Sequence, residues 1–203
     1  MAYTPATEEL IRALQGLPGI GSRSAARMAL HLLERDTESA QWLNNALAEA
    51  LNKVHRCPSC RTLTEQVECD ICQDSERDAS SLCVVVNDAD RAAIEMSKQF
   101  QGHYFVLHGV LSPIEGVGPE QLAIFDLIDK LKNNDVSEVI FVLDDQMESE
   151  ATVFYITEQL KAIDVRCSRV TLMHLKNGNL DQAESRHLVS ALTNRQEITL
   201  EQE

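Results

Sequence analysis

Four cysteines in two closely spaced pairs are the residues of this sequence best suited to chemistry. Cys57-Pro-Ser-Cys60 is followed after eight residues by Cys69-Asp-Ile-Cys72. Such pairs can direct four thiolates to one tetrahedral zinc ion. The alternatives are two disulfides or a thioredoxin-like redox pair, but a redox motif needs one pair and disulfides need an oxidising compartment. The spacing predicts one zinc ion per chain, with a structural role because four cysteines leave no ligand position for water.

A glycine-containing hairpin is the second candidate site. Gly19 and Gly21 flank one apolar residue, and Ser22 is predicted to cap a helix that carries Arg23 and Arg27 four residues apart on one face. Glycines let backbone N–H groups point outward beside the positive end of the helix dipole, so the turn suits a phosphate group. A plain helix corner with solvated arginines is the alternative. The cap and the two arginines favour phosphate contacts, which would not read base sequence.

Carboxylates that follow two expected strands form the third candidate site. They are Asp88 and Asp90 after the first strand, and Asp144, Asp145, Glu148 and Glu150 after the third. Open α/β sheets bind ligands at the carboxyl ends of their strands, and such a group could hold Mg²⁺ for phosphoryl chemistry. Carboxylates are also favoured in the first turn of any helix by its dipole. The residues by themselves leave both interpretations open.

Composition and charge limit the classes of function. The 203 residues are 44% hydrophobic and 25% charged, as in ordinary globular proteins. Because neither a leader pattern nor an apolar run of about 20 residues is evident, we expect a soluble, cytoplasmic protein without a membrane partner. The net charge is −14, but residues 1–61 carry +1 and residues 62–203 carry −15. Nucleic-acid contact is therefore expected from the first third, while the acidic remainder suits a basic protein partner or a metal ion.

Three helices are predicted before the cysteines. Thr4 caps the first, with Pro5 at its first position, and Gly16 ends it. The second follows the hairpin, and the third starts near Glu38. The third helix has an apolar stripe that we expect to close a small N-terminal core: Leu43, Leu47, Ala50, Leu51 and Val54. A basic group beside the first cysteine pair is expected either to extend the cationic surface or to be solvated: His55, Arg56 and Arg61.

After the cysteines, apolar strands alternate with helices. The predicted strands are 82–86, 104–107, 139–143 and 165–172, and the predicted helices are 89–99, 119–132 and one that carries Val153, Ile156 and Leu160. Strands that are apolar on both faces and alternate with helices indicate a mostly parallel sheet. The Gly- and Pro-rich loop 109–120 is expected to be ordered. The fold class is therefore α+β with several domains.

Together these motifs resemble the bacterial recombination mediator family RecR. The matching segments are Leu17-Pro-Gly-Ile-Gly, Ser24-Ala-Ala-Arg27, His31-Leu-Leu33, the four cysteines, Arg77-Asp78, Ala93-Ile-Glu95, residues 104–107, Leu111-Ser-Pro and Gly116-Val-Gly-Pro119. No single segment is decisive. Their order and spacing over about residues 5–165 are specific to this family.

The resemblance implies four parts: a helix-hairpin-helix domain (1–54), a four-cysteine zinc knuckle (55–77), a Toprim (topoisomerase-primase type) α/β domain (78–172) and a C-terminal arm (173–203). It implies a DNA-binding mediator and not an enzyme. Such proteins form dimers and ring-like tetramers, partner with RecO and sometimes RecF, and help load RecA onto single-stranded DNA coated by single-strand-binding protein. The family uses its Toprim face for partners, which indicates Asp144 and Glu148 here.

The sequence departs from the family pattern in three places. Val86 stands where a glutamate usually ends the first Toprim strand, and the segments 144–150 and 173–180 replace other family motifs. The alternative function is a Mg²⁺-dependent Toprim nuclease or nucleotidyl transferase. Val86 argues against it, because the replacement removes a group that organises metal and moves protons in such chemistry.

Overall fold

The computed structural model describes residues 2–170 and 190–199. The chain divides into two compact units, Met1–Val54 and His55–Glu203. The zinc stretch belongs to the second unit, and the predicted division into four parts stays a prediction. In the described part of the chain, no helix is both long and apolar enough to cross a bilayer.

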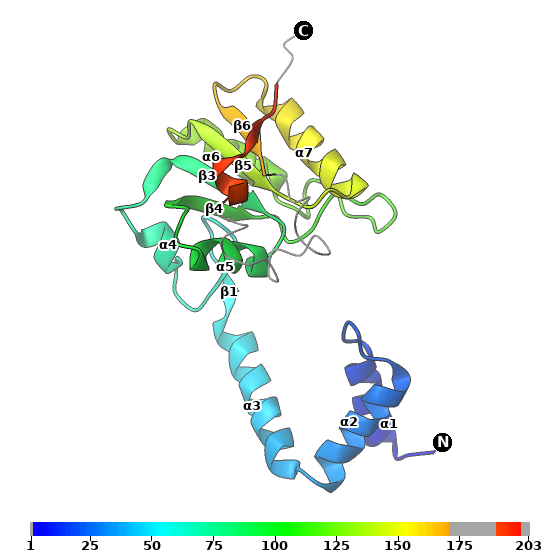
Figure 1. The fold of residues 1–203 in the computed structure, drawn as a ribbon. Coiled ribbons are helices and arrows are strands. Elements are labelled where there is room, and N and C mark those ends of the chain that lie inside the picture. Colours follow the sequence, from blue (N-terminus) through cyan, green and yellow to red (C-terminus); the bar gives the residue numbers. More distant parts are fainter. Residues whose placement is uncertain (1, 171–189, 200–203) are drawn as a thin grey trace. The chain divides into compact units, whose positions relative to one another are not determined.

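The first unit consists of three helices, α1 (Pro5–Gln15), α2 (Ser22–Glu34) and α3 (Thr37–Lys53) (Figure 1). Thr4 caps α1 as predicted, because its hydroxyl accepts a hydrogen bond from the third helical N–H, with Pro5 at the first position. The predicted cap of α2 is wrong. Gly21 is the cap residue and Ser22 is already helical, so no side chain accepts from the first N–H groups of α2.

The first unit buries very little apolar surface. Among its described residues only Ala25 and Ala29 are buried hydrophobics. The prediction that α3 closes an N-terminal core is wrong, since the side chains of Leu47 and Leu51 are 58% and 76% exposed. Figure 1 shows the reason, which is that α3 diverges from α2 after the turn that joins them. Helical periodicity identified an apolar face of α3, but it does not say what that face contacts.

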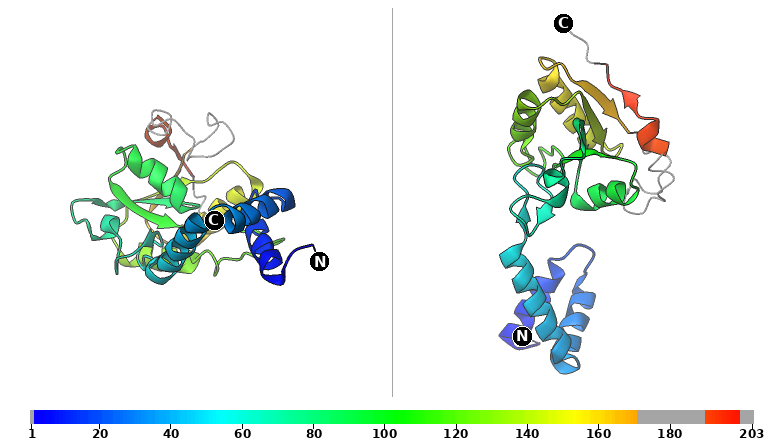
Figure 2. Two further views of the ribbon diagram at one scale, coloured as in Figure 1. Left: turned by 90° about the horizontal axis from the view of Figure 1, so that it is seen from below. Right: turned by 90° about the vertical axis from the view of Figure 1, so that its left-hand side faces the viewer.

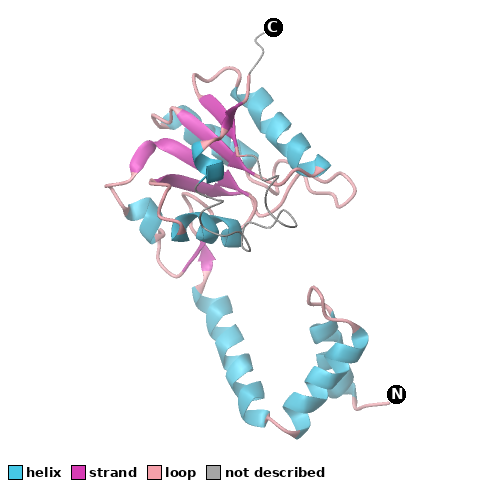
Figure 3. Cartoon of the chain, in the orientation of Figure 1, coloured by secondary structure: helices cyan, strands magenta, loops and turns pink. Residues whose placement is uncertain are grey.

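A five-stranded sheet in the order β4-β3-β5-β6-β7 forms the centre of the second unit (Figure 3). The strands are β3 (Asp78–Val85), β4 (Gly102–Val106), β5 (Glu138–Val142), β6 (Arg166–Arg169) and β7 (Gln196–Glu197). The first four are parallel, which confirms the predicted sheet. The strand β7, red in Figure 2, pairs antiparallel with β6 and was not predicted. Its two polar residues carry no strand signal of their own.

Helices cover both faces of this sheet. On one face, α6 (Ile124–Asn133) and α7 (Met147–Leu160) pack on Leu82, Val84 and Phe141. On the other, Ile94 of α5 (Asp88–Met96) packs with Cys83 and Val85. Successive side chains of β3 therefore enter opposite cores, as period-two alternation requires. Cys83 and Cys167 are buried free thiols, and burial raises the pKa of Cys167 to about 11.

One expectation at an element end differs from the structure. The helix predicted from Pro119 begins at Ile124, because Ala123 adopts a left-handed conformation with φ 52° and the residues before it form turns. The loop before that helix is ordered as predicted: Ser112 and Val117 form an antiparallel bridge. Of the expected C-terminal arm, 190–199 is described and holds a helical turn and β7, whereas 173–189 and 200–203 lie outside the described residues.

Candidate zinc centre and nucleic-acid interface

The four cysteines are brought together by two short turns. The first pair follows β1 (His55–Arg56), and the second pair lies at the start of α4 (Asp70–Gln73). Their four sulfur atoms lie within 4.8 Å of one another, and Cys60 Sγ is 3.5 Å from Cys69 Sγ. Sulfurs around a tetrahedral zinc ion with Zn–S bonds of ~2.3 Å lie about 3.8 Å apart. The cluster therefore fits one zinc ion.

The ionisation of the cluster also favours a metal. Hydrogen bonding with Cys72 lowers the pKa of Cys60 to about 6, while burial raises the pKa of Cys69 to about 11. The hydrogen bond to Cys60 and burial raise the pKa of Cys72 as well. Of these three thiols, Cys60 is the one that ionises most readily. A divalent cation would stabilise all four thiolates together.

The zinc knuckle is fastened to the α/β sheet by hydrogen bonds. The carbonyl oxygen of Cys60 accepts from the N–H of Val106 in β4 at 2.9 Å, and that of Ser59 accepts from Lys130 Nζ in α6 at 2.8 Å. Asp88 accepts from the N–H of Leu63 at 3.1 Å. When the knuckle folds, these hydrogen bonds also fix its position against the end of β4 and the helix α6.

Arg61 has a role that the sequence prediction missed. Its guanidinium donates to the carbonyl oxygens of Leu107 at 3.2 Å, Gln121 at 3.3 Å and Leu122, so it does not extend a basic surface. Its backbone is left-handed, with φ 66°, and its own carbonyl hydrogen-bonds His108 Nε2 at 2.7 Å. The signal that could have found it is its position directly after Cys-x-x-Cys, where the chain must reverse.

The hairpin has the geometry predicted for a phosphate contact. Leu17 accepts a hydrogen bond from the N–H of Ile20 at 3.2 Å, and Gly19, with φ 77°, occupies the turn position that requires a positive φ. Gly21 has an ordinary φ of −81°, and a Cβ there would meet nothing within 4 Å. Glycine is a favoured N-cap residue, and its missing side chain also leaves room for a ligand to approach the backbone.

Arg23 and Arg27 lie one turn apart on α2, directly behind the hairpin, and both are exposed. Neither forms an ion pair within the described residues. Since the first N–H groups of α2 also lack a side-chain cap, the start of this helix presents backbone donors and two guanidinium groups together. The arrangement suits neighbouring phosphates of a nucleic acid.

The predicted carboxylates do not form one group. Asp90 is buried and Asp88 is held by the zinc knuckle and by Arg91 at 3.3 Å, so the expected six-residue acidic surface is wrong for these two. Asp144 and Glu148 instead line a cavity of about 300 Å³ with Val86 and Glu115. β3 and β5 are neighbours, which is why Val86 and Asp144 meet.

A cation from the next strand neutralises part of this acidic loop. Arg169, at the end of β6, pairs with Asp145 at 3.5 Å and with Glu150, and it donates to the carbonyl oxygen of Asp144 at 2.9 Å. Asp144 also accepts from the hydroxyl of Ser149. Within the described residues, the four cysteines are the sole group placed to hold a metal ion. No local sequence pattern indicated that Arg169 would reach this loop.

The three parts define a zinc-containing protein that combines a helix-hairpin-helix unit, of the type found in DNA-binding proteins, with a four-cysteine centre and a mostly parallel α/β sheet. Comparison with known families agrees for each part. Residues 7–51 match the RecR helix-hairpin-helix family, residues 54–74 match the RecR four-cysteine zinc finger domain and residues 80–171 match the Toprim domain. The four cysteines are thus the ligands of a zinc finger.

Whole-chain relatives identify the family. The recombination protein RecR of Saccharophagus degradans is 45% identical over 97% of this chain and 100% of its own length. That of Coxiella burnetii is 40% identical over 95% of this chain and 96% of its own, and that of Myxococcus xanthus is 41% identical over 93% and 96%. The chain belongs to the RecR family of recombination proteins.

Proposed function

We propose that this chain is a non-enzymatic mediator of DNA repair and recombination in the cytoplasm. It binds DNA and, with RecO and in some settings RecF, helps load RecA onto single-stranded DNA coated by single-strand-binding protein. Membership of the RecR family supports the recombination role. The uneven distribution of charge supports two separate binding surfaces. The cationic start of α2 binds DNA, and the acidic residues 62–203 bind protein partners.

One observation carries the DNA-binding part of the proposal. The start of α2 combines an uncapped row of N–H groups, an exposed glycine hairpin and the exposed side chains of Arg23 and Arg27. These groups contact phosphates and not base edges, so binding is independent of sequence. A mediator that must act on any damaged site needs this kind of contact. Because Gly19 and Gly21 have no side chains, the sugar-phosphate backbone of DNA can approach the hairpin closely.

The experiment replaces both Arg23 and Arg27 with alanine and measures single-stranded DNA binding at several salt concentrations. We expect weaker binding to all sequences, with the slope of log K against log [salt] reduced by ~0.7 for each lost phosphate contact. Arg12→Ala removes one positive charge from α1, where Arg12 is ion-paired with Glu9, and serves as the control for each of the two replacements. Equal salt slopes for the double variant and the parent would refute the hairpin site.

Asp144 and Glu148 are proposed as the partner surface for RecO. Glu148 is exposed in the first turn of α7, beside the half-buried Asp144. Charge complementarity of this kind mainly raises the association rate and fades with salt. Glu148→Lys should therefore slow RecO association, and Glu65→Lys, an equal charge change in the exposed part of the zinc knuckle, should not. Unchanged association rates for Glu148→Lys would place the partner site elsewhere.

We further propose that the chain assembles with itself, as a dimer or a ring-like tetramer. The apolar face of α3, formed by Leu43, Leu47 and Leu51, is 46–76% exposed on a unit that has almost no buried core of its own. An exposed apolar face of this size is costly in water and is normally covered. A second copy of the same chain can cover it, because the same face is then buried twice.

The alternative is a Mg²⁺-dependent nuclease or nucleotidyl transferase. The cavity beside Asp144, with carboxylates from Glu115 and Glu148, is the observation that favours it. Against it, Val86 lies where the strand-end carboxylate would be, and Arg169 already supplies positive charge to the loop. Incubation with DNA or nucleotides and Mg²⁺ or Mn²⁺ distinguishes the two functions. Cleavage or transfer that is lost in Asp144→Asn would establish the enzyme, and we expect no turnover.

A further inference from the structure

Four basic side chains follow one another along α2 at a constant spacing of four residues: Arg23, Arg27, His31 and Arg35. Each step between the three members on α2 rises about 6 Å and turns by about 40°, so Arg23, Arg27 and His31 form a stripe about 12 Å long that winds by about 80°, and Arg35 follows it at the C-cap. The buried residues Ala25 and Ala29 lie on the opposite side of the helix. All four members of the stripe are exposed.

The arginines of the stripe are unpaired where neighbouring cations are paired. In the described part of the first unit, Arg12 and Lys53 form ion pairs with Glu9 and Glu49. The arginines of the stripe form none with any described residue. In a chain of net charge −14, three such arginines on one helix leave a strong local field directed at solvent.

Helix stability explains only part of the stripe. Cations are favoured in the last turn of a helix, which accounts for His31 and for Arg35 at the C-cap. Arg23 lies in the first turn, at the positive end of the dipole, where a cation is unfavourable and where α2 has no acidic residue to offset it. The dipole would therefore favour only half of the stripe.

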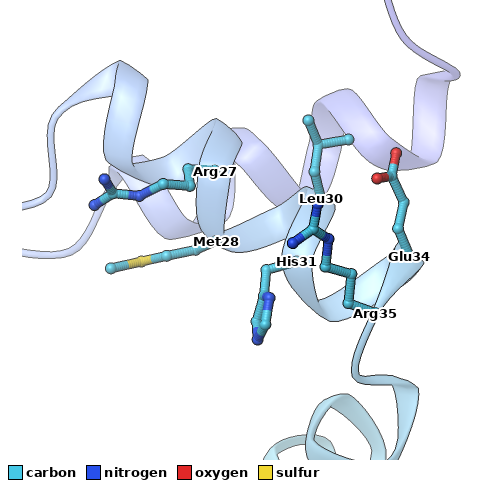
Figure 4. A pocket seen from close by; sticks show the side chains of 6 residues that line it. All are labelled: Arg27, Met28, Leu30, His31, Glu34 and Arg35. Atoms are coloured by element: carbon cyan, nitrogen blue, oxygen red, sulfur yellow. The ribbon is translucent and has the colours of Figure 1, made fainter.

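Figure 4 shows the surface that the distal half of the stripe creates. In this view Arg27 extends towards the start of α2, His31 points away from the helix and Arg35 bends back in front of Leu30, while Glu34 is turned away from His31. These residues line a hollow together with the side chains of Met28 and Leu30. Cationic groups with apolar side chains between them suit a nucleic-acid strand, whose phosphates are charged and whose sugars and bases are not.

We infer that one nucleic-acid strand continues beyond the hairpin along α2, with its phosphates contacting His31 and Arg35 after Arg23 and Arg27. This deepens the proposed function and rests on it, because the hairpin end of the stripe is the DNA contact already proposed. The constant step of the four side chains favours a repeating ligand such as a phosphate backbone over a folded protein surface. His31 and Arg35 are therefore binding residues, and Glu34 at the edge of the stripe opposes binding.

The test compares four variants by single-stranded DNA binding over a range of salt concentrations. His31→Gln with Arg35→Gln should weaken binding and lower the salt slope by ~0.7 for the lost charge of Arg35, and Arg35→Lys should restore the contribution of position 35. Glu34→Gln should tighten binding, a gain that a folding defect does not produce. Arg12→Gln should leave binding unchanged. Zinc content and helical circular dichroism confirm that each variant is folded.

The outcomes separate this inference from the proposed function. An unchanged slope in the His31 and Arg35 variant, with a reduced slope in the Arg23 and Arg27 variant, would overturn the inference and leave the hairpin site standing. Unchanged slopes in both would overturn both. If the His31 and Arg35 variant altered the mass of the protein in solution and not its affinity for DNA, the stripe would contact an acidic protein surface and the inference would also be wrong.

Discussion

Arg195 and Glu138 form a bidentate ion pair, with Nε 2.7 Å from Oε1 and Nη2 2.8 Å from Oε2. Glu138 begins β5 with its side chain 5% exposed, and Arg195 immediately precedes β7. Ser168 and Arg166 of β6 also donate to the same carboxylate, at 2.7 Å and 3.0 Å. This buried carboxylate therefore fastens the C-terminal strand to the sheet, and it is satisfied by three neighbours at once.

Glu138 should make the second unit sensitive to acid. The hydrogen bond from Arg195 lowers the pKa of Glu138 to about 2, from an ordinary value of 4.5. A lowered pKa stabilises the fold above the unfolded value, and this stabilisation is lost as pH falls from about 5 towards 2. It amounts to about 3 kcal/mol at most. Urea unfolding at pH 7 and pH 3 should show a smaller difference for Glu138→Gln than for the parent, and an equal difference would contradict the assignment.

Removing zinc should loosen β4 as well as the knuckle. The N–H of Val106 donates to Cys60, so unfolding of the knuckle removes the acceptor of that hydrogen bond. Amide hydrogen exchange after chelation should rise in residues 102–107 and stay unchanged in 22–34, which belong to the other unit. Cys69→Ser should reproduce the effect. The control is Cys167→Ser, which changes a buried thiol outside the cluster and should retain zinc.

Arg61 should stabilise the second unit through its side chain and strain it through its backbone. Arg61→Gly removes the hydrogen bonds to Leu107, Gln121 and Leu122 but accepts φ 66° freely, whereas Arg61→Ala loses the same bonds and keeps the strain. We expect a loss of about 2–3 kcal/mol for glycine and about 1 kcal/mol more for alanine. Denaturant unfolding checks the order, and an alanine variant as stable as the glycine variant would disprove it.

Local chemistry made some of this structure predictable and left other parts hidden. The cysteine spacing, the Thr4 cap and the apolar strands are short-range signals, and each was confirmed. Arg195 reaches Glu138 from 57 residues away and Arg169 enters the acidic loop from the next strand, contacts that only the sheet order creates. The apolar face of α3 was visible in the sequence. The exposure of that face could not be predicted, because periodicity does not identify a packing partner.

The exposed face of α3 should hold copies of the chain together. Leu47→Glu with Leu51→Glu would place two carboxylates in the proposed contact, where burying each leucine contributes about 1.5–3 kcal/mol. We expect the mass in solution, measured by light scattering or sedimentation, to fall to that of a single chain. Met96→Glu changes a side chain that is 79% exposed on α5 and should leave the mass unchanged. A parent that is already monomeric at high concentration would refute the proposal.

Arg169 should determine how the acidic loop presents Glu148 to a partner. Its guanidinium is the one cation that holds Asp145, Glu150 and the carbonyl of Asp144 within the described residues. The substitution Arg169→Met would keep the apolar packing of the side chain and remove this cation. The expected cost is about 1–3 kcal/mol, with faster amide exchange confined to 144–150, because the carboxylates then repel one another.

The same variant tests whether loop order matters for association. RecO should bind Arg169→Met more slowly than the parent, although Glu148 itself is intact, and adding Glu148→Lys should then have a smaller effect than in the parent because the two changes act on one surface. Arg166→Met is the matched control, since Arg166 lies on the same strand but pairs with Glu138. Parent-like exchange in 144–150 would show that Arg169 does not order the loop. Additive effects of the two substitutions would show that it does not act through Glu148.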